Sequence, residues 1–183
     1  MQEEFVFSGF GGQGVMFVGQ LLAYAGMDAG LEVTWIPSYG PEMRGGTAHC
    51  FVVLADKPIG SPLVSNPKVA VVFNNPSFDK YKEIVAEGGL MVVNSSLVQR
   101  KNTRKGITVL NIPATAIADQ LGNTRMTNIV LLGALLAKRP VIAMDVLRAS
   151  LADHIPPHRK NMLDANYQAL QRGAEFVEDL VTI

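Results

Sequence analysis

Apolar residues are arranged along the chain in two kinds of segment. Short runs rich in valine, isoleucine and phenylalanine have the length and composition of buried strands, and they lie at residues 5–7, 32–36, 48–54, 69–73, 90–93 and 107–112. Longer segments have apolar residues at helical spacing, at 15–29, 76–86, 114–121, 128–137, 146–154 and 160–180. The pattern therefore predicts about six strands separated and followed by helices.

The order of these segments predicts an α/β fold. No helix separates the second predicted strand from the third, so we expect at least one antiparallel pair. The other strands alternate with helices, which favours parallel neighbours, and the C-terminal part is helical. We therefore expect a three-layer α/β/α sandwich with a mixed, mostly parallel sheet. Residues 1–183 contain no internal repeat and no linker, so the sequence predicts a single domain.

Local signals predict several helix ends. Gly30 is expected at the C′ position that ends the first helix, because glycine adopts a positive φ without strain. Asn75 is expected to cap the second helix, with Pro76 at its first position. Gly88 and Gly89 then separate this helix from the fifth predicted strand.

A glycine cluster follows the first predicted strand and opens the first predicted helix. Its candidate ligand-binding residues are Gly9, Gly11, Gly12, Gln13 and Gly14. The first, second and last of these have the G-x-G-x-x-G spacing, in which the first glycine permits a sharp turn and the second a close approach to a ligand. N–H groups at the helix start would then face a phosphate. A tight turn that binds nothing has the same spacing, so the spacing leaves both interpretations open.

The acidic residue of a nicotinamide-binding domain is missing. Such a domain carries aspartate or glutamate at the end of its second strand, where it holds the ribose hydroxyls. Residues 35–38, Trp-Ile-Pro-Ser, occupy that place here. Glu32 lies at the opposite end of the predicted strand, and Asp28 lies in the preceding helix. The sequence therefore argues against ordinary NAD binding. Of the three functions considered for this chain, a stand-alone NAD-dependent enzyme is the least supported.

A second glycine-rich segment, residues 37–46, is predicted as a loop after the second strand. Ligands of open α/β sheets gather at such strand ends. An arginine there can bind a phosphate or carboxylate through two N–H groups, while glycines allow close approach. The candidate residues are Ser38, Tyr39, Gly40, Arg44, Gly45 and Gly46. A structural loop whose arginine pairs with Glu42 or with a partner subunit is the equal alternative.

Composition narrows the class of partner. Charged residues make up only 17% of the chain and hydrophobic residues 48%, which favours a subunit interface. Sixteen basic and sixteen acidic residues give a net charge of zero, which argues against nucleic-acid and membrane surfaces. The single cysteine, Cys50, allows no internal disulfide and no iron–sulfur cluster held by this chain alone. No signal peptide or membrane span is recognisable, so we expect a soluble cytoplasmic protein.

Three further residue types are weaker candidates. His154 and His158 flank two prolines that prevent the helical alignment of metal ligands, so they are expected in a turn between helices. Cys50 lies in an apolar strand and is expected to be an unreactive buried thiol. Asn128 opens an apolar helix, and it either caps that helix or reaches the ligand loop; the cap is the favoured interpretation.

These motifs together resemble the gamma subunit of the 2-oxoacid:ferredoxin oxidoreductases. The chain is similar to that family in GFGGQG at 9–14, SYGPEMRGG at 38–46, DKPIGSP at 56–62 and TNIVLLGALL at 127–136. The likeness extends over nearly the whole chain in the same order. Members of the family often have an aspartate where this chain has Lys68, a departure that concerns packing or surface charge.

The resemblance implies a part in a larger enzyme that converts a 2-oxoacid to acyl-coenzyme A and passes electrons to ferredoxin. Thiamine diphosphate, magnesium and the iron–sulfur clusters would lie on alpha, beta and ferredoxin-like delta subunits. This chain would have no catalytic residue and no activity alone, and would pack beside the active site, where coenzyme A could meet the glycine cradle. Neither the resemblance nor individual residues identify the substrate among pyruvate, 2-oxoglutarate, branched-chain and aryl oxoacids. A free-standing nucleotide- or CoA-binding module is the alternative function.

Overall fold

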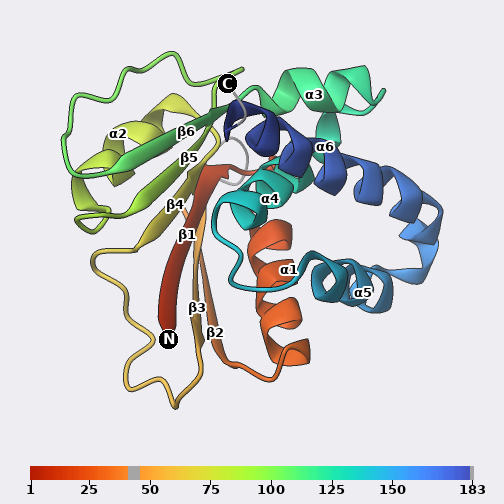
Figure 1. Cartoon of the computed structure of the whole chain (residues 1–183), viewed down its shortest axis with the longest axis horizontal. Helices are drawn as coiled ribbons and strands as arrows, with labels where there is room; N and C mark the ends of the chain where they lie inside the picture. Colours follow the sequence, from red (N-terminus) through yellow and green to blue (C-terminus); the bar gives the residue numbers. More distant parts are fainter. Residues whose placement is uncertain (41–45, 182–183) are drawn as a thin grey trace.

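A sheet of six strands, in the order β2-β3-β1-β4-β5-β6, forms the centre of the computed structural model, which describes residues 1–40 and 46–181 (Figure 1). The strands are β1 Gln2–Phe10, β2 Glu32–Tyr39, β3 Thr47–Ala55, β4 Val69–Val72, β5 Leu90–Asn94 and β6 Thr108–Ile112. The α-helices are α1 Val15–Asp28, α2 Asn75–Ile84, α3 Ala114–Gln120, α4 Thr127–Lys138, α5 Met144–His154 and α6 Leu163–Val181. Two 3₁₀ segments, η1 Thr124–Met126 and η2 Pro157–Met162, precede α4 and α6.

The sheet is mixed, as the sequence predicted. β3 lies between β2 and β1 and runs antiparallel to both, whereas β1, β4, β5 and β6 are parallel neighbours. Val52 of β3 is thus paired with Trp35 on one side and with Phe5 on the other. The expected α/β sandwich is confirmed, and the C-terminal ends of four parallel strands point to one edge of the sheet.

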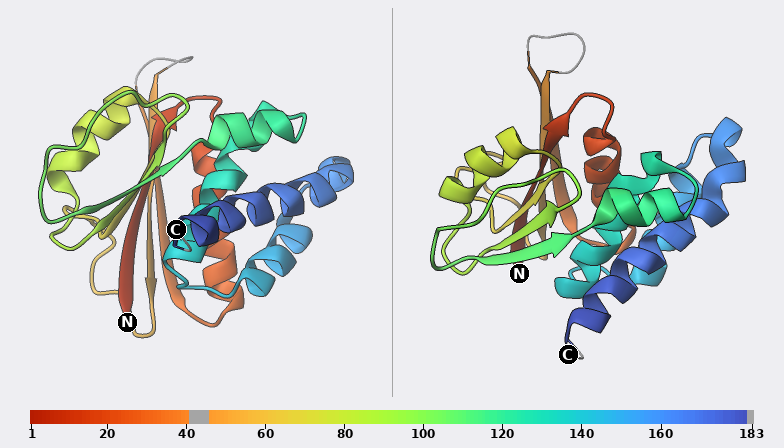
Figure 2. Two further views of the ribbon diagram at one scale, coloured as in Figure 1. Left: turned by 45° about the horizontal axis from the view of Figure 1, so that its top comes forward. Right: turned by 90° about the horizontal axis from the view of Figure 1, so that it is seen from above.

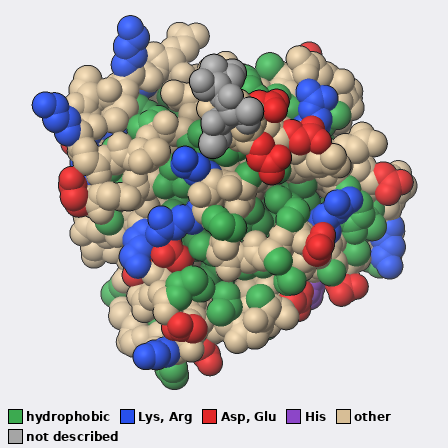
Figure 3. Space-filling view, viewed as in Figure 1, with side chains coloured by type: hydrophobic (Ala, Val, Ile, Leu, Met, Phe, Trp, Pro, Cys, Tyr) green, Lys and Arg blue, Asp and Glu red, His purple; other side chains and the backbone are tan. Residues whose placement is uncertain are grey.

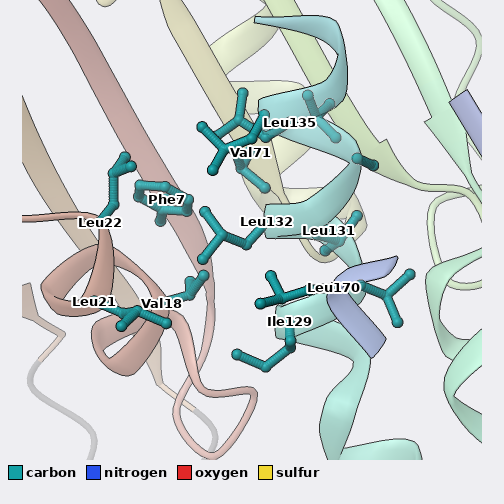
Figure 4. Close-up of a cluster of buried hydrophobic side chains, with 14 of the residues drawn as sticks. Phe7, Val18, Leu21, Leu22, Val71, Ile129, Leu131, Leu132, Leu135 and Leu170 are labelled. Carbon is teal, nitrogen blue, oxygen red and sulfur yellow. The ribbon is translucent and has the colours of Figure 1, made fainter. Parts of the chain in front are cut away.

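The two faces of the sheet are covered unequally (Figure 2). Of the helices in residues 1–40 and 46–181, α2 alone packs on one face, where its Phe78 and Tyr81 form a buried cluster with Val6 of β1 and with Val98 from the segment after β5. The other face is covered by α1 and α4, with α5 against α1 and α6 against α4. Figure 4 shows this larger core, in which side chains of α1 and α4 meet Phe7 and Val71 of the sheet and Leu170 of α6 packs against α4. Because both faces are covered, the central strands are apolar in succession rather than alternating.

Helices α4 and α6 cross at two glycines. A Cβ atom added to Gly133 would overlap the backbone carbonyl oxygen of Leu170, and one added to Gly173 would overlap that of Val130. The two backbones therefore approach more closely than any side chain would allow. This contact holds the C-terminal helix against the core helix.

A carboxylate at the start of β1 ties the sheet to the end of α4. Glu3 is only 8% exposed, and both of its oxygens accept hydrogen bonds of 2.9 Å from Arg139 Nη2. The Lys68 ammonium lies 3.9 Å from Glu3 Oε1 and also donates to the carbonyl oxygen of Gln2. The lysine that departs from the family pattern thus contributes to the packing of β1.

Several element boundaries differ from the sequence prediction. The cap of α2 is Asn74, whose Oδ1 accepts from the Ser77 N–H at 3.0 Å, so the expected cap, Asn75, is wrong by one residue. β2 continues to Tyr39, because pairing with β3 extends past Pro37 at the free edge. The helix expected from residue 160 begins at Leu163, since the two prolines before it favour a 3₁₀ turn. Gly30 ends α1 as expected, with φ 77°.

Across the ranges 1–40 and 46–181, no helix combines the length and apolarity that crossing a bilayer requires.

Candidate functional site

The glycine cluster forms the turn between β1 and α1. Gly12 has φ 94° and Gly14 has φ 75°, both in the left-handed region, and Gly14 is the N-cap of α1. Gly9 is different, because it lies within β1 and does not have a positive φ. A Cβ there would lie 2.6 Å from Gln13 Oε1 and 2.9 Å from Phe73 Cβ. The expectation that Gly9 makes the turn is therefore wrong; the structure uses it for close packing.

Several amides of the turn and of the helix start have no hydrogen-bond acceptor among the described residues. Gly11 N–H donates to the Gly46 carbonyl at 3.0 Å, and Gln13 N–H donates to the Phe10 carbonyl at 3.2 Å. Within the described part of the chain, the amides of Gly12, Gly14 and Val15 have no protein acceptor. They lie at the start of a 14-residue helix, where the partial positive charge of the backbone is greatest.

Asn128 contacts this turn and does not cap its own helix. The N-cap of α4 is Met126, and Asn128 is the second residue of that helix, 5% exposed. Its Nδ2 donates to the Gly14 carbonyl oxygen at 3.2 Å. The favoured interpretation of Asn128 as the N-cap is therefore wrong. Its Nδ2 binds the Gly14 carbonyl oxygen across the molecule, and its Oδ1 accepts from the adjacent Ile129 N–H at 3.0 Å. The structure brings together the glycine cluster and Asn128.

Of the described residues in the second glycine-rich segment, only part lies beside the glycine turn. Gly46 touches the turn through the hydrogen bond from Gly11. Ser38 and Tyr39 belong to strand β2 instead of a loop, and Gly40 N–H donates to the Thr47 carbonyl at 2.7 Å, continuing the hairpin. These three residues line neither of the cavities described next. Arg44 and Gly45, also expected in the site, lie outside the described residues.

Two adjoining cavities open beside the turn. The larger, of about 460 Å³, lies between the starts of α1 and α4 and the region of η2; it is lined by Gly12, Gly14, Phe17, Arg125, Met126, Asn128, Ile129, Ile155, Arg159, Met162 and Asn166. The smaller, of about 240 Å³, is lined by Gly12, Gln13, Phe73, Leu97, Thr115, Thr124, Arg125 and Thr127. Both lie at the C-terminal edge of the parallel strands, where β1 is followed by a helix on one face and β4 by a helix on the other. Ligands of open α/β sheets bind at such a point.

The charge of the cavities is positive. Arg125 is shared by both cavities and Arg159 lines the larger one, and neither has an ion-pair partner within residues 1–40 and 46–181. Among the residues that the structure describes, no aspartate or glutamate lines either cavity. Two unpaired guanidinium groups beside free helix-start amides suit an anion such as a phosphate. Sequence reasoning missed both arginines, although Arg125 stands just before the recognised segment 127–136.

The remaining candidates lie elsewhere. His154 stacks on Tyr24 with ring centroids 4.0 Å apart, and its Nε2 lies 3.7 Å from Asp28 Oδ2. Among the residues that the structure describes, no His, Cys, Asp and Glu side chains are grouped so as to hold a metal ion. Cys50 is fully buried, and burial raises the pKa of its thiol to about 12, as expected of an unreactive core cysteine.

The fold and the site together define an α/β domain with a cavity at the strand ends that is lined by two arginine side chains. The chain belongs to the pyruvate ferredoxin/flavodoxin oxidoreductase family, whose model matches residues 4–176. The resemblance found in the sequence motifs is thereby confirmed.

Individual relatives agree with this family. The chain is 34% identical to the 2-oxoglutarate synthase subunit KorC of Methanocaldococcus jannaschii, covering 98% of this chain and 96% of the relative. It is 35% identical to the ketoisovalerate oxidoreductase subunit VorA of Methanothermobacter thermautotrophicus over 94% of this chain, but it spans only 36% of that relative's length. The crystal structure of a keto/oxoacid ferredoxin oxidoreductase gamma subunit from Geobacter sulfurreducens is similar with a TM-score of 0.83 and 26% identity, covering 97% of this chain and 99% of that one.

Proposed function

We propose that this chain is the gamma subunit of a multisubunit 2-oxoacid:ferredoxin oxidoreductase and that its larger cavity receives the phosphate-bearing part of coenzyme A. The proposal rests on one observation: Arg125 and Arg159 line the same cavity as Gly12 and Gly14 of the glycine turn, whose amides have no acceptor among the described residues. Coenzyme A offers several phosphate groups and an uncharged arm. Phe17, Met126 and Met162 supply apolar walls for uncharged parts of such a ligand.

The catalytic groups of the reaction are proposed to lie on partner subunits. Partner subunits would hold thiamine diphosphate with magnesium, which would supply the chemistry at the oxoacid, and iron–sulfur clusters, which would supply electron transfer to ferredoxin. A cluster needs several thiolates, and this chain has one cysteine, which is buried. Alpha, beta and ferredoxin-like delta subunits in the cytoplasm are the proposed partners. The relatives named as subunits of such enzymes, and the greater length of VorA, support a role as one part of a larger assembly.

Within that assembly the residues of this chain bind and orient. Backbone amides at Gly12 and Gly14, which line the larger cavity, would bind phosphate oxygens, and Arg125 and Arg159 would neutralise their charge. Asn128 keeps the turn in place through its hydrogen bond to Gly14. No group of this chain is assigned a proton or electron transfer.

The outer surface fits a subunit that packs against others. Hydrophobic side chains are visible across the middle of the face in Figure 3. Leu63 is 81% exposed and Leu97 is 45% exposed, on two different connecting segments. We expect the chain alone to self-associate and to form a stoichiometric complex when it is produced with the other subunits.

Replacing Arg125 in the assembled enzyme tests the proposal. Loss of a charge-assisted hydrogen bond worth roughly 1.5–3 kcal/mol corresponds to an increase of about 10- to 150-fold in the KM for coenzyme A in Arg125→Ala. Arg100→Ala is the matched control, because Arg100 pairs with Asp79 at 3.2 Å and lines neither cavity. The KM for the 2-oxoacid should change in neither variant.

Two results would contradict the proposal. One is an Arg125→Ala enzyme whose KM for coenzyme A equals that of Arg100→Ala. The other is a chain that binds coenzyme A alone but is not retained by thiamine-binding and ferredoxin-like subunits in a pull-down. That second result would favour the free-standing nucleotide- or CoA-binding module.

A further inference from the structure

The side chain of Gln13 is anchored at its oxygen. Gln13 Oε1 accepts a hydrogen bond of 2.7 Å from the Phe10 backbone N–H and one of 3.3 Å from Asn74 Nδ2. Gln13 Nε2 has no hydrogen-bond partner among the described residues, and Gln13 lines the smaller cavity. The carbonyl end of this amide therefore faces the protein, and its NH₂ group is the end left for a ligand.

The orientation of Asn74 is itself fixed by a helix. Asn74 is 5% exposed, and its Oδ1 accepts from the Ser77 N–H at 3.0 Å as the N-cap of α2. With Oδ1 used in this way, only the NH₂ group of Asn74 can point to Gln13. Gly9 completes the arrangement, since any Cβ there would meet Gln13 Oε1 at 2.6 Å.

We infer that Asn74 is a positioning residue, which holds the Gln13 amide so that its NH₂ group donates to the ligand of the adjoining cavities. This inference rests on the proposed function. A helix on one face of the sheet thus sets the direction of a donor in a site formed mainly on the other face. The Phe10 N–H and the Asn74 NH₂ group both donate to Gln13 Oε1. If the Gln13 amide were turned by 180°, its own NH₂ group would face these two donors and both hydrogen bonds would be lost.

Asn74→Asp tests the inference because it keeps the helix cap and removes the donor. Aspartate caps helices as well as asparagine does. Its carboxylate would accept from Gln13 Nε2, turn the amide and withdraw the NH₂ group from the cavity. In the assembled enzyme we expect a KM for coenzyme A about tenfold higher with kcat nearly unchanged, as for one lost hydrogen bond. Hydrogen exchange at the Phe10 amide should become about tenfold faster.

A neighbouring asparagine provides the matched control. Asn75→Asp adds the same charge one residue away and keeps the acceptor for the Gln99 N–H at 3.0 Å, without touching Gln13. It should leave Phe10 exchange and the KM for coenzyme A near wild-type values. Should Asn74→Asp fail to fold, Gln13→Glu replaces it: the carboxylate still accepts from Phe10 and Asn74, so Phe10 stays protected while affinity for coenzyme A falls.

The outcomes separate this inference from the proposed function. If Asn74→Asp leaves both Phe10 exchange and the KM for coenzyme A unchanged, or if Asn75→Asp alters them equally, the positioning role is overturned. If Arg125→Ala has no effect on coenzyme A, the proposed function fails and the ligand part of the inference fails with it. The response of Phe10 exchange to Asn74→Asp would then still measure the anchor itself.

Discussion

Gly14→Ala measures how tightly the glycine turn is fitted against α4. Gly14 has φ 75°, and a Cβ added there would overlap the Asn128 amide, lying 2.9 Å from Cγ. Gly30 has almost the same φ, 77°, but its added Cβ would meet no atom within 4 Å. Both alanine substitutions therefore strain the backbone equally, and only Gly14→Ala adds a collision.

The expected magnitudes follow from these two contributions. A left-handed conformation costs a residue with a Cβ roughly 1–2 kcal/mol, so Gly30→Ala should lower the free energy of unfolding by that amount. Overpacking of a filled site adds roughly 1–3 kcal/mol, so Gly14→Ala should lower it by roughly 2–5 kcal/mol. A domain of ordinary stability, roughly 5–15 kcal/mol, would remain folded with Gly30→Ala, whereas Gly14→Ala at its largest cost would use up the stability at the lower end of that range.

Equilibrium unfolding in urea, followed by circular dichroism at one protein concentration for all variants, gives the differences between these free energies. Asn128→Ala removes the colliding amide together with its hydrogen bond to Gly14, and alone should cost roughly 0.5–1.5 kcal/mol. The double variant should be more stable than the sum of the single losses by roughly 1–3 kcal/mol. If Gly14→Ala costs no more than Gly30→Ala, or if the two site substitutions are simply additive, the steric argument is refuted.

Two further predictions concern the core. Gly173→Ala should lower the free energy of unfolding by roughly 1–3 kcal/mol despite better helix propensity, because its Cβ would meet the backbone of α4, with Ala134 N at 3.0 Å; a stable variant in the same urea assay would contradict this. Burial raises the pKa of the Cys50 thiol from 9.0 to about 12, so the folded state keeps a proton that the unfolded state releases. The free energy of unfolding should therefore fall as pH rises from about 9 to about 12, and Cys50→Ala should abolish that part of the fall.

The sheet could be predicted because its signals are local. The apolar run at 69–73 has no polar position, and it became β4, buried on both faces between β1 and β5. The absence of a helix between β2 and β3 was enough to predict an antiparallel pair. Boundaries were less certain, since the choice between Asn74 and Asn75 as the cap depends on which side chain reaches the Ser77 N–H.

The site was harder, because its contacts join distant parts of the chain. Asn128 binds Gly14 from 114 positions away, and Asn74 binds Gln13 from 61 positions away. Neither contact has a periodic or local signal. Arg159 lies in the 3₁₀ segment η2, which begins at the second of two prolines, and it lines the same cavity as Arg125 only because the fold brings η2 to the side of the cavity. Position in the fold, more than residue type, assigns these arginines to the site.

The glycine motif was recognised correctly, but the role predicted for its first glycine, Gly9, was wrong. The G-x-G-x-x-G spacing predicted a glycine at the turn, whereas the two turn conformations belong to Gly12 and Gly14. Gly9 stays in the strand, and the space left by its missing side chain is filled by Gln13 Oε1. A larger residue at position 9 would therefore act through the orientation of Gln13 before it affected the turn. The glycine and the glutamine of this motif are parts of one arrangement, and Asn74 is the residue outside the motif that completes it.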